Sequence, residues 1–170
     1  MLKIALQKTI FISLLWLVSS VYVKVHAAEH ITASQNLSQA FVLKDTTGKT
    51  QQLSNYKGKW VIVNYWATWC PPCLEEVPDL VTLYDSRKNK DVMVIGVVID
   101  YKDAKEVAAY VDDMLMSYPI VYGDESVTNQ IGPADVLPTS FIYNPQGKLI
   151  KIKRGKVTKE YLEKLFSQKN

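Results

Sequence analysis

The stretch "WVIVNYWATWCPPCLEEVP", residues 60–78, decides the fold. Its first seven residues are apolar or aromatic except for Asn64, and β-branched valine and isoleucine are frequent among them. A short run of this composition predicts a β-strand that is buried on both faces. From Cys70 onward, apolar residues recur at steps of three and four, which predicts a helix. The sequence therefore predicts a strand that leads directly into a helix opened by a Cys-x-x-Cys pair.

Strand and helix patterns alternate through the rest of the chain. The other expected elements are, in chain order, a short strand and turn within 41–59, a buried strand at 91–100, a helix at 103–117, a short strand at 119–123, a helix at 125–132, a hairpin at 139–153 and a helix at 158–168. This order predicts an α/β sandwich with a mixed central sheet.

The amino terminus has the features of an export signal. Lys3 and Lys8 precede an uncharged run at residues 9–23, which as a helix would span about 22 Å and fall short of a bilayer core of about 30 Å. Val25 and Ala27 follow, and small residues at this spacing are typical of a signal peptidase cleavage site. We therefore expect residues 1–27 to be a cleaved signal peptide, with an uncleaved membrane anchor as the alternative. Either one places the protein in the periplasm or on the extracytoplasmic face of the membrane.

Removal of the signal peptide would also remove the net positive charge of the chain. Three of the 20 basic residues lie in the first 27 positions, and the remaining 17 equal the 17 acidic residues. A chain with this balance lacks the basic character of a nucleic-acid-binding protein. Residues 28–39 read as a flexible leader, and residues 40–170 are long enough for one domain with its own core.

Cys70 and Cys73 are the only cysteines. As a structural staple the pair would be inefficient, because closing so short a loop contributes only about 2 kcal/mol, against about 4.7 kcal/mol for a loop of a hundred residues. A structural zinc site needs four ligands, and the only histidines are His26 and His30, so no metal site is expected. Thiolates also suit Cu(I), and a copper carrier would complete its site with His30 or a methionine.

The position of the pair favours redox chemistry. Cys70 is the expected N-cap of the helix, where its sulfur would accept a hydrogen bond from the backbone N–H of Cys73. That bond and the helix dipole would lower the pKa of the Cys70 thiol and make it the nucleophile. Cys73, one turn into the helix, would be the buried resolving thiol.

The residues around the cysteines refine this interpretation. Pro71 and Pro72 have no backbone N–H, so they withhold donors from a Cys70 thiolate, and a poorly stabilised thiolate favours a reductant. Glu76 shares a helix face with Cys73, either as a buried acid/base with a raised pKa or as a solvated acid of the first turn. Pro78 is expected to kink the helix.

These residues resemble the thioredoxin superfamily, specifically its exported TlpA/ResA-like thiol-disulfide oxidoreductases, which are related to the AhpC/TSA redoxins. The match covers about residues 40–168 and includes the 60–78 stretch and "VLPTSFIYNPQGKL". It implies a thioredoxin-like three-layer sandwich with a mixed central β-sheet and an inserted helix-strand element within residues 91–123.

The resemblance also implies roles for single residues. Pro138 is similar to the family's cis-proline. Together with Trp69, Leu137 and Thr139 it would bind substrate, and Trp69 would also shield the site. Glu76 matches the active-site glutamate of the ResA-like branch. Asn64 stands where cytoplasmic thioredoxins carry a buried aspartate and cannot titrate, which makes Glu76 the better candidate base.

The resulting hypothesis is an extracytoplasmic enzyme that reduces protein disulfides and needs no cofactor beyond the redox-active Cys70–Cys73 pair. The resemblance implies a DsbD/CcdA-like membrane thiol as electron donor and disulfide-containing proteins, apocytochrome c among them, as substrates. The alternatives are a disulfide-forming oxidase, a copper-delivery or assembly factor, and a peroxidase. A peroxidase site places threonine three residues before the reactive cysteine, whereas Ala67 holds that position here and Thr68 follows it.

Overall fold

The computed structural model of the protein describes residues 40–168. The expected signal peptide or anchor at 1–27 and the leader at 28–39 lie outside the described residues. Within the described part, no helix is both long enough and apolar enough to cross a membrane.

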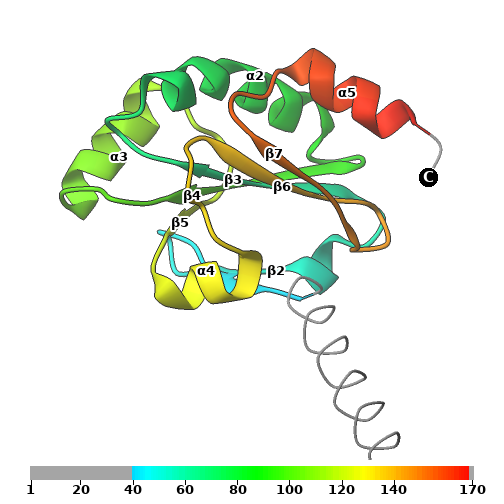
Figure 1. Cartoon of the computed structure of the whole chain (residues 1–170), viewed down its shortest axis with the longest axis horizontal. Helices are drawn as coiled ribbons and strands as arrows, with labels where there is room; N and C mark the ends of the chain where they lie inside the picture. Colours follow the sequence, from blue (N-terminus) through cyan, green and yellow to red (C-terminus); the bar gives the residue numbers. More distant parts are fainter. Residues whose placement is uncertain (1–39, 169–170) are drawn as a thin grey trace, which may run out of the picture. The chain divides into compact units, whose positions relative to one another are not determined.

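A five-stranded mixed sheet forms the centre of the domain, with strand order β5-β4-β3-β6-β7 (Figure 1). Neighbouring strands are parallel from β3 to β5 and antiparallel from β3 through β6 to β7. In chain order the strands are β3 (Trp60–Trp66), β4 (Val92–Val98), β5 (Ile120–Tyr122), β6 (Thr139–Tyr143) and β7 (Leu149–Arg154). Every residue of β3 and β4 is buried, as their continuous apolar runs predict.

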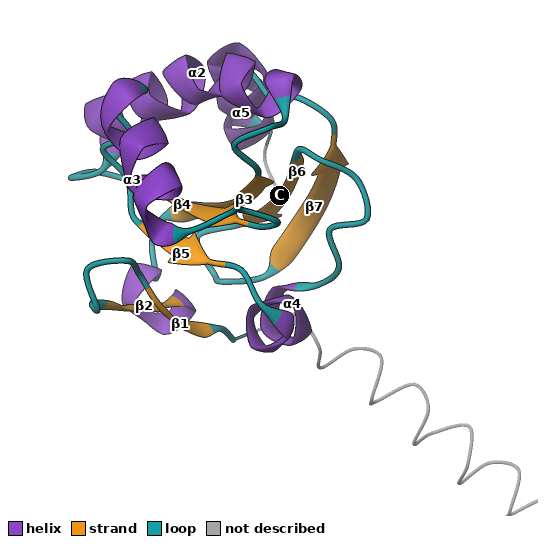
Figure 2. Cartoon of the chain, turned by 90° about the vertical axis from the view of Figure 1, so that its left-hand side faces the viewer, coloured by secondary structure: helices purple, strands orange, loops and turns teal. Residues whose placement is uncertain are grey.

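Two layers cover the two faces of this sheet (Figures 1 and 2). One face carries α2 (Pro71–Arg87), α3 (Ala104–Asp113) and α5 (Lys159–Ser167). The other face carries α4 (Glu125–Ile131) together with the small hairpin formed by β1 (Val42–Lys44) and β2 (Thr50–Gln52). Each side of the sheet has its own apolar core, and the core under α2 includes both cysteines. The expected three-layer α/β sandwich with a mixed sheet is confirmed.

Three details differ from or extend the expectations. The segment before β3 holds two strands and a 3-10 helix, η1 (Leu53–Tyr56), instead of the single short strand and turn expected there. Helix α3 ends at Asp113 instead of continuing to residue 117. Helix α2 runs from Pro71 to Arg87 with Pro78 inside it, and the kink expected at Pro78 stays a prediction.

Candidate active site

The two cysteines lie where β3 passes into α2. Cys70 is the N-cap residue of α2 and has extended backbone angles, and Pro71 and Pro72 occupy the first two helical positions. The sulfurs of Cys70 and Cys73 form a disulfide that joins Cα atoms 5.3 Å apart. The Cys70 side chain is 4% exposed and Cys73 is fully buried. The less buried sulfur is thus the one at the helix end, as expected for an attacking and a resolving cysteine.

The expected N-cap hydrogen bond to the Cys70 sulfur is absent in this oxidised form. The sulfur is bonded to Cys73 instead, and it is the Cys70 carbonyl oxygen that accepts, from the N–H groups of Cys73 at 3.0 Å and Leu74 at 3.2 Å. Pro71 and Pro72 are both exposed and offer no backbone donor at the rim of the site. The first turn of α2 is therefore closed by hydrogen bonds to the Cys70 carbonyl oxygen. The two prolines that follow Cys70 offer its sulfur no backbone N–H.

Glu76 follows Cys73 by about one turn of α2 and is fully buried. Its Oε1 accepts a hydrogen bond from Asn64 Nδ2 at 2.7 Å, and its Oε2 accepts one from the Val157 backbone N–H, also at 2.7 Å. Burial raises the pKa of Glu76 to about 7, and the two hydrogen bonds offset only part of that effect. Glu76 is therefore buried and not a solvated acid of the first turn, and its role as an acid/base stays a prediction.

Asn64 connects Glu76 to the sheet. Its Nδ2 also donates to Ser140 Oγ on the neighbouring strand β6, at 3.1 Å. An amide provides donors without a charge of its own, so Asn64, from the central strand β3, orients the carboxyl group of Glu76 and does not itself titrate. Glu75, the preceding residue, is exposed and forms an ion pair with Lys156 at 2.9 Å.

The segment before β6 lies across from the cysteine loop. Thr139 pairs with Tyr65 in β3, one residue before that strand ends, so Pro138 stands opposite the point where the chain turns toward Cys70. The Leu137–Pro138 peptide bond is cis, as expected for Pro138. Leu137 packs against the apolar cluster that contains both cysteines, and Thr139 Oγ1 donates to the Val136 carbonyl at 2.6 Å.

Residues 155–157, here termed the bridging segment, join these parts and were missed in the sequence. The Gly155 N–H donates to the Pro138 carbonyl at 2.8 Å, and the Val157 N–H donates to Glu76. Gly155 has φ +79°, a conformation that favours glycine, and this glycine directly after a strand was the available sequence signal. One short segment thus contacts both the proline loop and the buried acid.

The third side of the site is the loop that follows β4. Trp69 is 57% exposed, and its indole Nε1 donates to the Asp100 carbonyl at 2.8 Å. The Thr68 hydroxyl donates to Glu106 Oε1 at 3.3 Å, so it is engaged with α3. The hydrogen bond to Asp100 holds the Trp69 ring at the surface, next to Cys70 in the chain. The neighbouring side chain, Thr68, is bonded to helix α3 instead.

Among the described residues, no group of three or more His, Cys, Asp or Glu side chains is arranged to hold a metal ion. His30, the ligand considered for copper, lies outside them.

Known proteins that are similar to this chain include thiol-disulfide oxidoreductases, in agreement with the cysteine pair at the start of α2. The AhpC/TSA family model matches residues 35–152. The thiol-disulfide oxidoreductase ResA of Bacillus subtilis is 30% identical over 143 residues, which cover 84% of this chain and 79% of the relative. The crystal structure of StoA from Bacillus subtilis superposes with a TM-score of 0.62 at 28% identity, covering 74% of this chain and 94% of that one. A thiol:disulfide interchange protein from Chlorobium tepidum gives a TM-score of 0.69 at 25% identity, covering 76% and 92% of the two chains.

Proposed function

The chain belongs to the AhpC/TSA family and is a thiol-disulfide oxidoreductase of thioredoxin fold, and from this premise we propose that it reduces disulfides of other proteins outside the cytoplasm. The observation that carries the proposal is the Cys70–Cys73 disulfide at the start of α2, with the buried carboxyl group of Glu76 one turn further along the same helix.

The reaction proceeds in two exchanges. In the reduced enzyme, the Cys70 thiolate attacks one sulfur of a substrate disulfide, forms a mixed disulfide and releases the first substrate thiol. The Cys73 thiolate then attacks the Cys70 sulfur, forms the intramolecular disulfide and releases the second substrate thiol. Two electrons pass from the enzyme to the substrate, and an external dithiol must return them before the next cycle.

Glu76 serves the second exchange. The Cys73 sulfur is fully buried, so its proton needs an acceptor inside the protein. A carboxyl group with a pKa of about 7 exchanges protons readily near neutral pH. Asn64 and the Val157 N–H act as positioning groups that hold its oxygens.

The hydrogen-bond donors around Cys70 support this direction of electron flow. Strong disulfide oxidants are strong because their reduced thiolate is heavily stabilised. Here the helix starts with Pro71 and Pro72, which supply no N–H, and no histidine lies among the described residues to supply a cation. The Cys70 thiolate is therefore a good electron donor, and its own donor is a DsbD/CcdA-like membrane thiol.

Substrate binding is assigned to the exposed Trp69, to Leu137 and Pro138 before β6, and to Thr139 at the start of that strand. The apolar, uncharged run at residues 9–23 supports export of the chain. Apocytochrome c, whose two cysteines must be reduced before they receive haem, is the proposed substrate of the exported enzyme.

Two measurements test the proposal. The reduction potential of the Cys70–Cys73 pair should lie near the thioredoxin end of the scale, about −270 mV. A potential near that of a strong oxidant, about −120 mV, would show instead that the protein forms disulfides. In cells, Cys73→Ala should accumulate mixed disulfides with substrate proteins, while Cys70→Ala, the matched control, should accumulate none. Failure of Cys73→Ala to trap any protein would contradict a role for Cys70 as the attacking thiol.

A further inference from the structure

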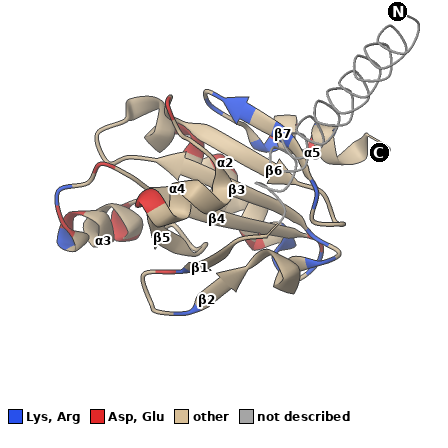
Figure 3. Cartoon of the chain, turned by 60° about the horizontal axis from the view of Figure 1, so that its bottom comes forward, with Lys and Arg blue, Asp and Glu red and all other residues tan. Residues whose placement is uncertain are grey.

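Charged residues are unevenly distributed over the chain although their total is balanced. Residues 148–164 contain seven Lys or Arg and two Glu, whereas residues 100–135 contain eight Asp or Glu and two Lys. Figure 3 shows the basic residues along β7 and acidic ones on α3 and α4. A separation of charge on this scale attracts partners of opposite charge to one end of a protein.

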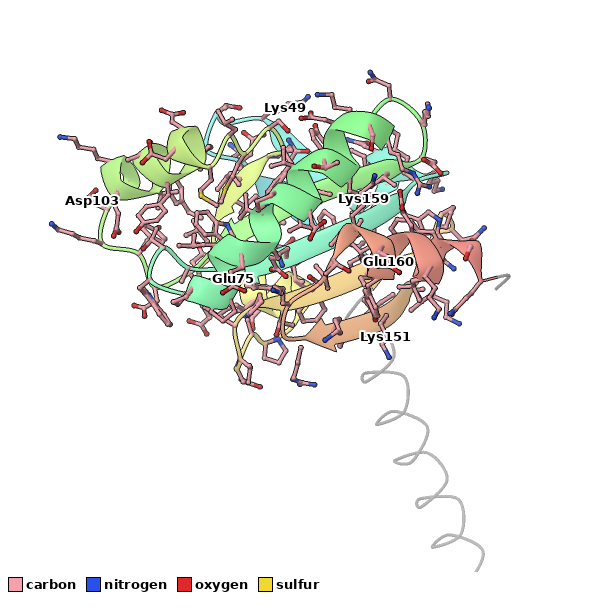
Figure 4. All side chains as sticks on the ribbon, turned by 90° about the horizontal axis from the view of Figure 1, so that it is seen from above. Lys49, Glu75, Asp103, Lys151, Lys159 and Glu160 are labelled. Carbon is pink, nitrogen blue, oxygen red and sulfur yellow. A yellow bond between two sulfur atoms is a disulfide. The ribbon has the colours of Figure 1, made fainter. Side chains whose placement is uncertain are left out.

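A groove lies between strand β7 and helix α5 on the basic side. It has a volume of about 460 Å³ and is lined by Ile150, Lys151, Tyr161, Lys164, Leu165 and Gln168, here termed the β7–α5 groove. Three of these side chains provide an apolar floor, and the two lysines provide positive charge at its sides. Figure 4 shows Lys151 on β7 beside the helix that carries Glu160.

The lysines of β7 extend the groove along the strand. Lys151 pairs with Ile142 of β6 and Lys153 pairs with Ser140, and both partners face the side of the sheet that α2 and α5 cover. Lys151 and Lys153 therefore point to the same side, and the Lys153 amino group lies 6.0 Å from the centre of the Tyr161 ring. Among residues 40–168, β7 has no strand on its other side, so its outer edge is free.

The charges of the groove are not already neutralised. Of the two glutamates on α5, Glu163 lies 3.8 Å from Lys159, and Glu160 is exposed. None of the ion pairs within the described residues includes Lys151, Lys153 or Lys164. An anionic group in the groove would therefore meet lysines that are not already in an ion pair with a carboxylate.

The groove leads to the disulfide site. Strand β7 ends at Arg154, and the bridging segment follows directly, with its hydrogen bonds to Pro138 and Glu76. The next lysine, Lys156, contacts Glu75 of the Cys-x-x-Cys helix. A chain that lies along β7 is thus guided toward Cys70.

We propose that the β7–α5 groove and the lysines of β7 dock an acidic segment of the protein whose disulfide is exchanged at Cys70. The proposal rests on the proposed function and specifies its partner as a protein with acidic residues close to the reactive disulfide. The apolar floor and the free strand edge suit a polypeptide, which brings side chains and backbone groups as well as charge. Continuity with the disulfide site favours the substrate as occupant over a bilayer or a second copy of the chain.

The test compares two synthetic peptides that contain a disulfide followed by four glutamates or by four glutamines. The reduced, purified protein is mixed with each at low ionic strength, and each rate is divided by the rate of the same preparation with hydroxyethyl disulfide, which is small and uncharged. The glutamate peptide should react about ten-fold faster than the glutamine peptide, and 0.5 M NaCl should remove the difference. Lys151→Glu/Lys164→Glu should abolish the preference, whereas Lys44→Glu/Lys57→Glu, which changes the net charge equally at exposed positions elsewhere, should retain it.

Equal rates for the two peptides, with normal turnover of hydroxyethyl disulfide, would refute the docking site and leave the proposed function intact. Absence of turnover with every disulfide would refute the proposed function itself. Two further outcomes would refute the proposal by assigning the groove to another occupant. Binding to phosphatidylglycerol vesicles that depends on Lys151 and Lys164, without any peptide preference, would assign it to a membrane surface. Salt-sensitive self-association in sedimentation, abolished by Lys151→Glu/Lys164→Glu, would assign it to a second copy of the chain.

Discussion

Replacement of Glu76 by glutamine should change how the stability of the oxidised protein depends on pH. The carboxyl group of Glu76 has a pKa of about 7 in the folded protein, against an ordinary value of 4.5. Below pH 4.5 the group is protonated in both the folded and the unfolded chain, so it does not lower the free energy of unfolding. As the pH rises from 4.5 to 7, the unfolded chain ionises while the folded chain keeps its proton, so the free energy of unfolding falls.

The size of this loss follows from the two pKa values. At about 1.4 kcal/mol for each pKa unit, the difference corresponds to about 3 kcal/mol, lost by pH 8 relative to pH 4.5. The glutamine variant keeps an oxygen for one of the two donors and turns an NH₂ group toward the other, which costs about 1 kcal/mol at every pH. The two effects are separable, because only the first depends on pH.

The assay is urea unfolding of the disulfide-bonded protein at half-unit intervals from pH 4.5 to 8, with wild type and Glu76→Gln measured in parallel. Other titrating groups contribute equally to both proteins, so the difference between the two curves isolates Glu76. Glu75→Gln is the matched control, because it removes a neighbouring carboxylate that is exposed, and its curve should run parallel to wild type. If the Glu76→Gln curve also runs parallel to wild type, Glu76 does not hold a raised pKa and the proton-transfer role assigned to it is wrong.

Three further predictions concern other parts of the molecule. Pro72→His adds an N–H and a potential cation beside Cys70, and equilibration with a thiol buffer should show a reduction potential that is less reducing by roughly 30 mV or more. Asn64→Asp places a second carboxylate against Glu76, so stability between pH 5 and 8 should fall by at least about 1.4 kcal/mol more than in wild type, and equal pH slopes would contradict the contact. Gly132→Ala puts a methyl group 2.7 Å from the Phe141 ring at a φ of +130°, and urea unfolding should show a loss of about 2–4 kcal/mol.

The fold was predictable from the sequence where the spacing of apolar residues matches the positions that the structure buries. The continuous apolar run of β3 and the switch to helical spacing after Cys70 both appear in the structure at the expected positions. The end of α3 was not predictable, because the helix ends in a Schellman motif built on leucine instead of glycine. Leu115 has φ +52° and is followed by a bond from the Met116 N–H to the Val111 carbonyl, so the usual glycine signal was absent.

In the candidate site, too, the local features were predictable from the sequence and the long-range contacts were not. The cysteines and their prolines are contiguous in the sequence, so their arrangement at the start of a helix followed from local rules. The burial of Glu76 depends on Val157, which is 81 positions away, and spacing alone left two interpretations open. No local pattern in the bridging segment predicts its contacts, because they form only when the pairing of β7 with β6 brings this segment to Pro138 and Glu76.

The hydrogen bond between the Val157 N–H and Glu76 gives the active site a built-in spectroscopic reporter. An amide proton held 2.7 Å from a carboxylate oxygen, measured between the heavy atoms, senses the charge on that oxygen directly. Its nuclear magnetic resonance frequency will therefore follow the protonation of Glu76, and any rearrangement of the site when the disulfide opens. A single backbone resonance, far from the cysteines in sequence, records the state of the catalytic centre without any label attached to it.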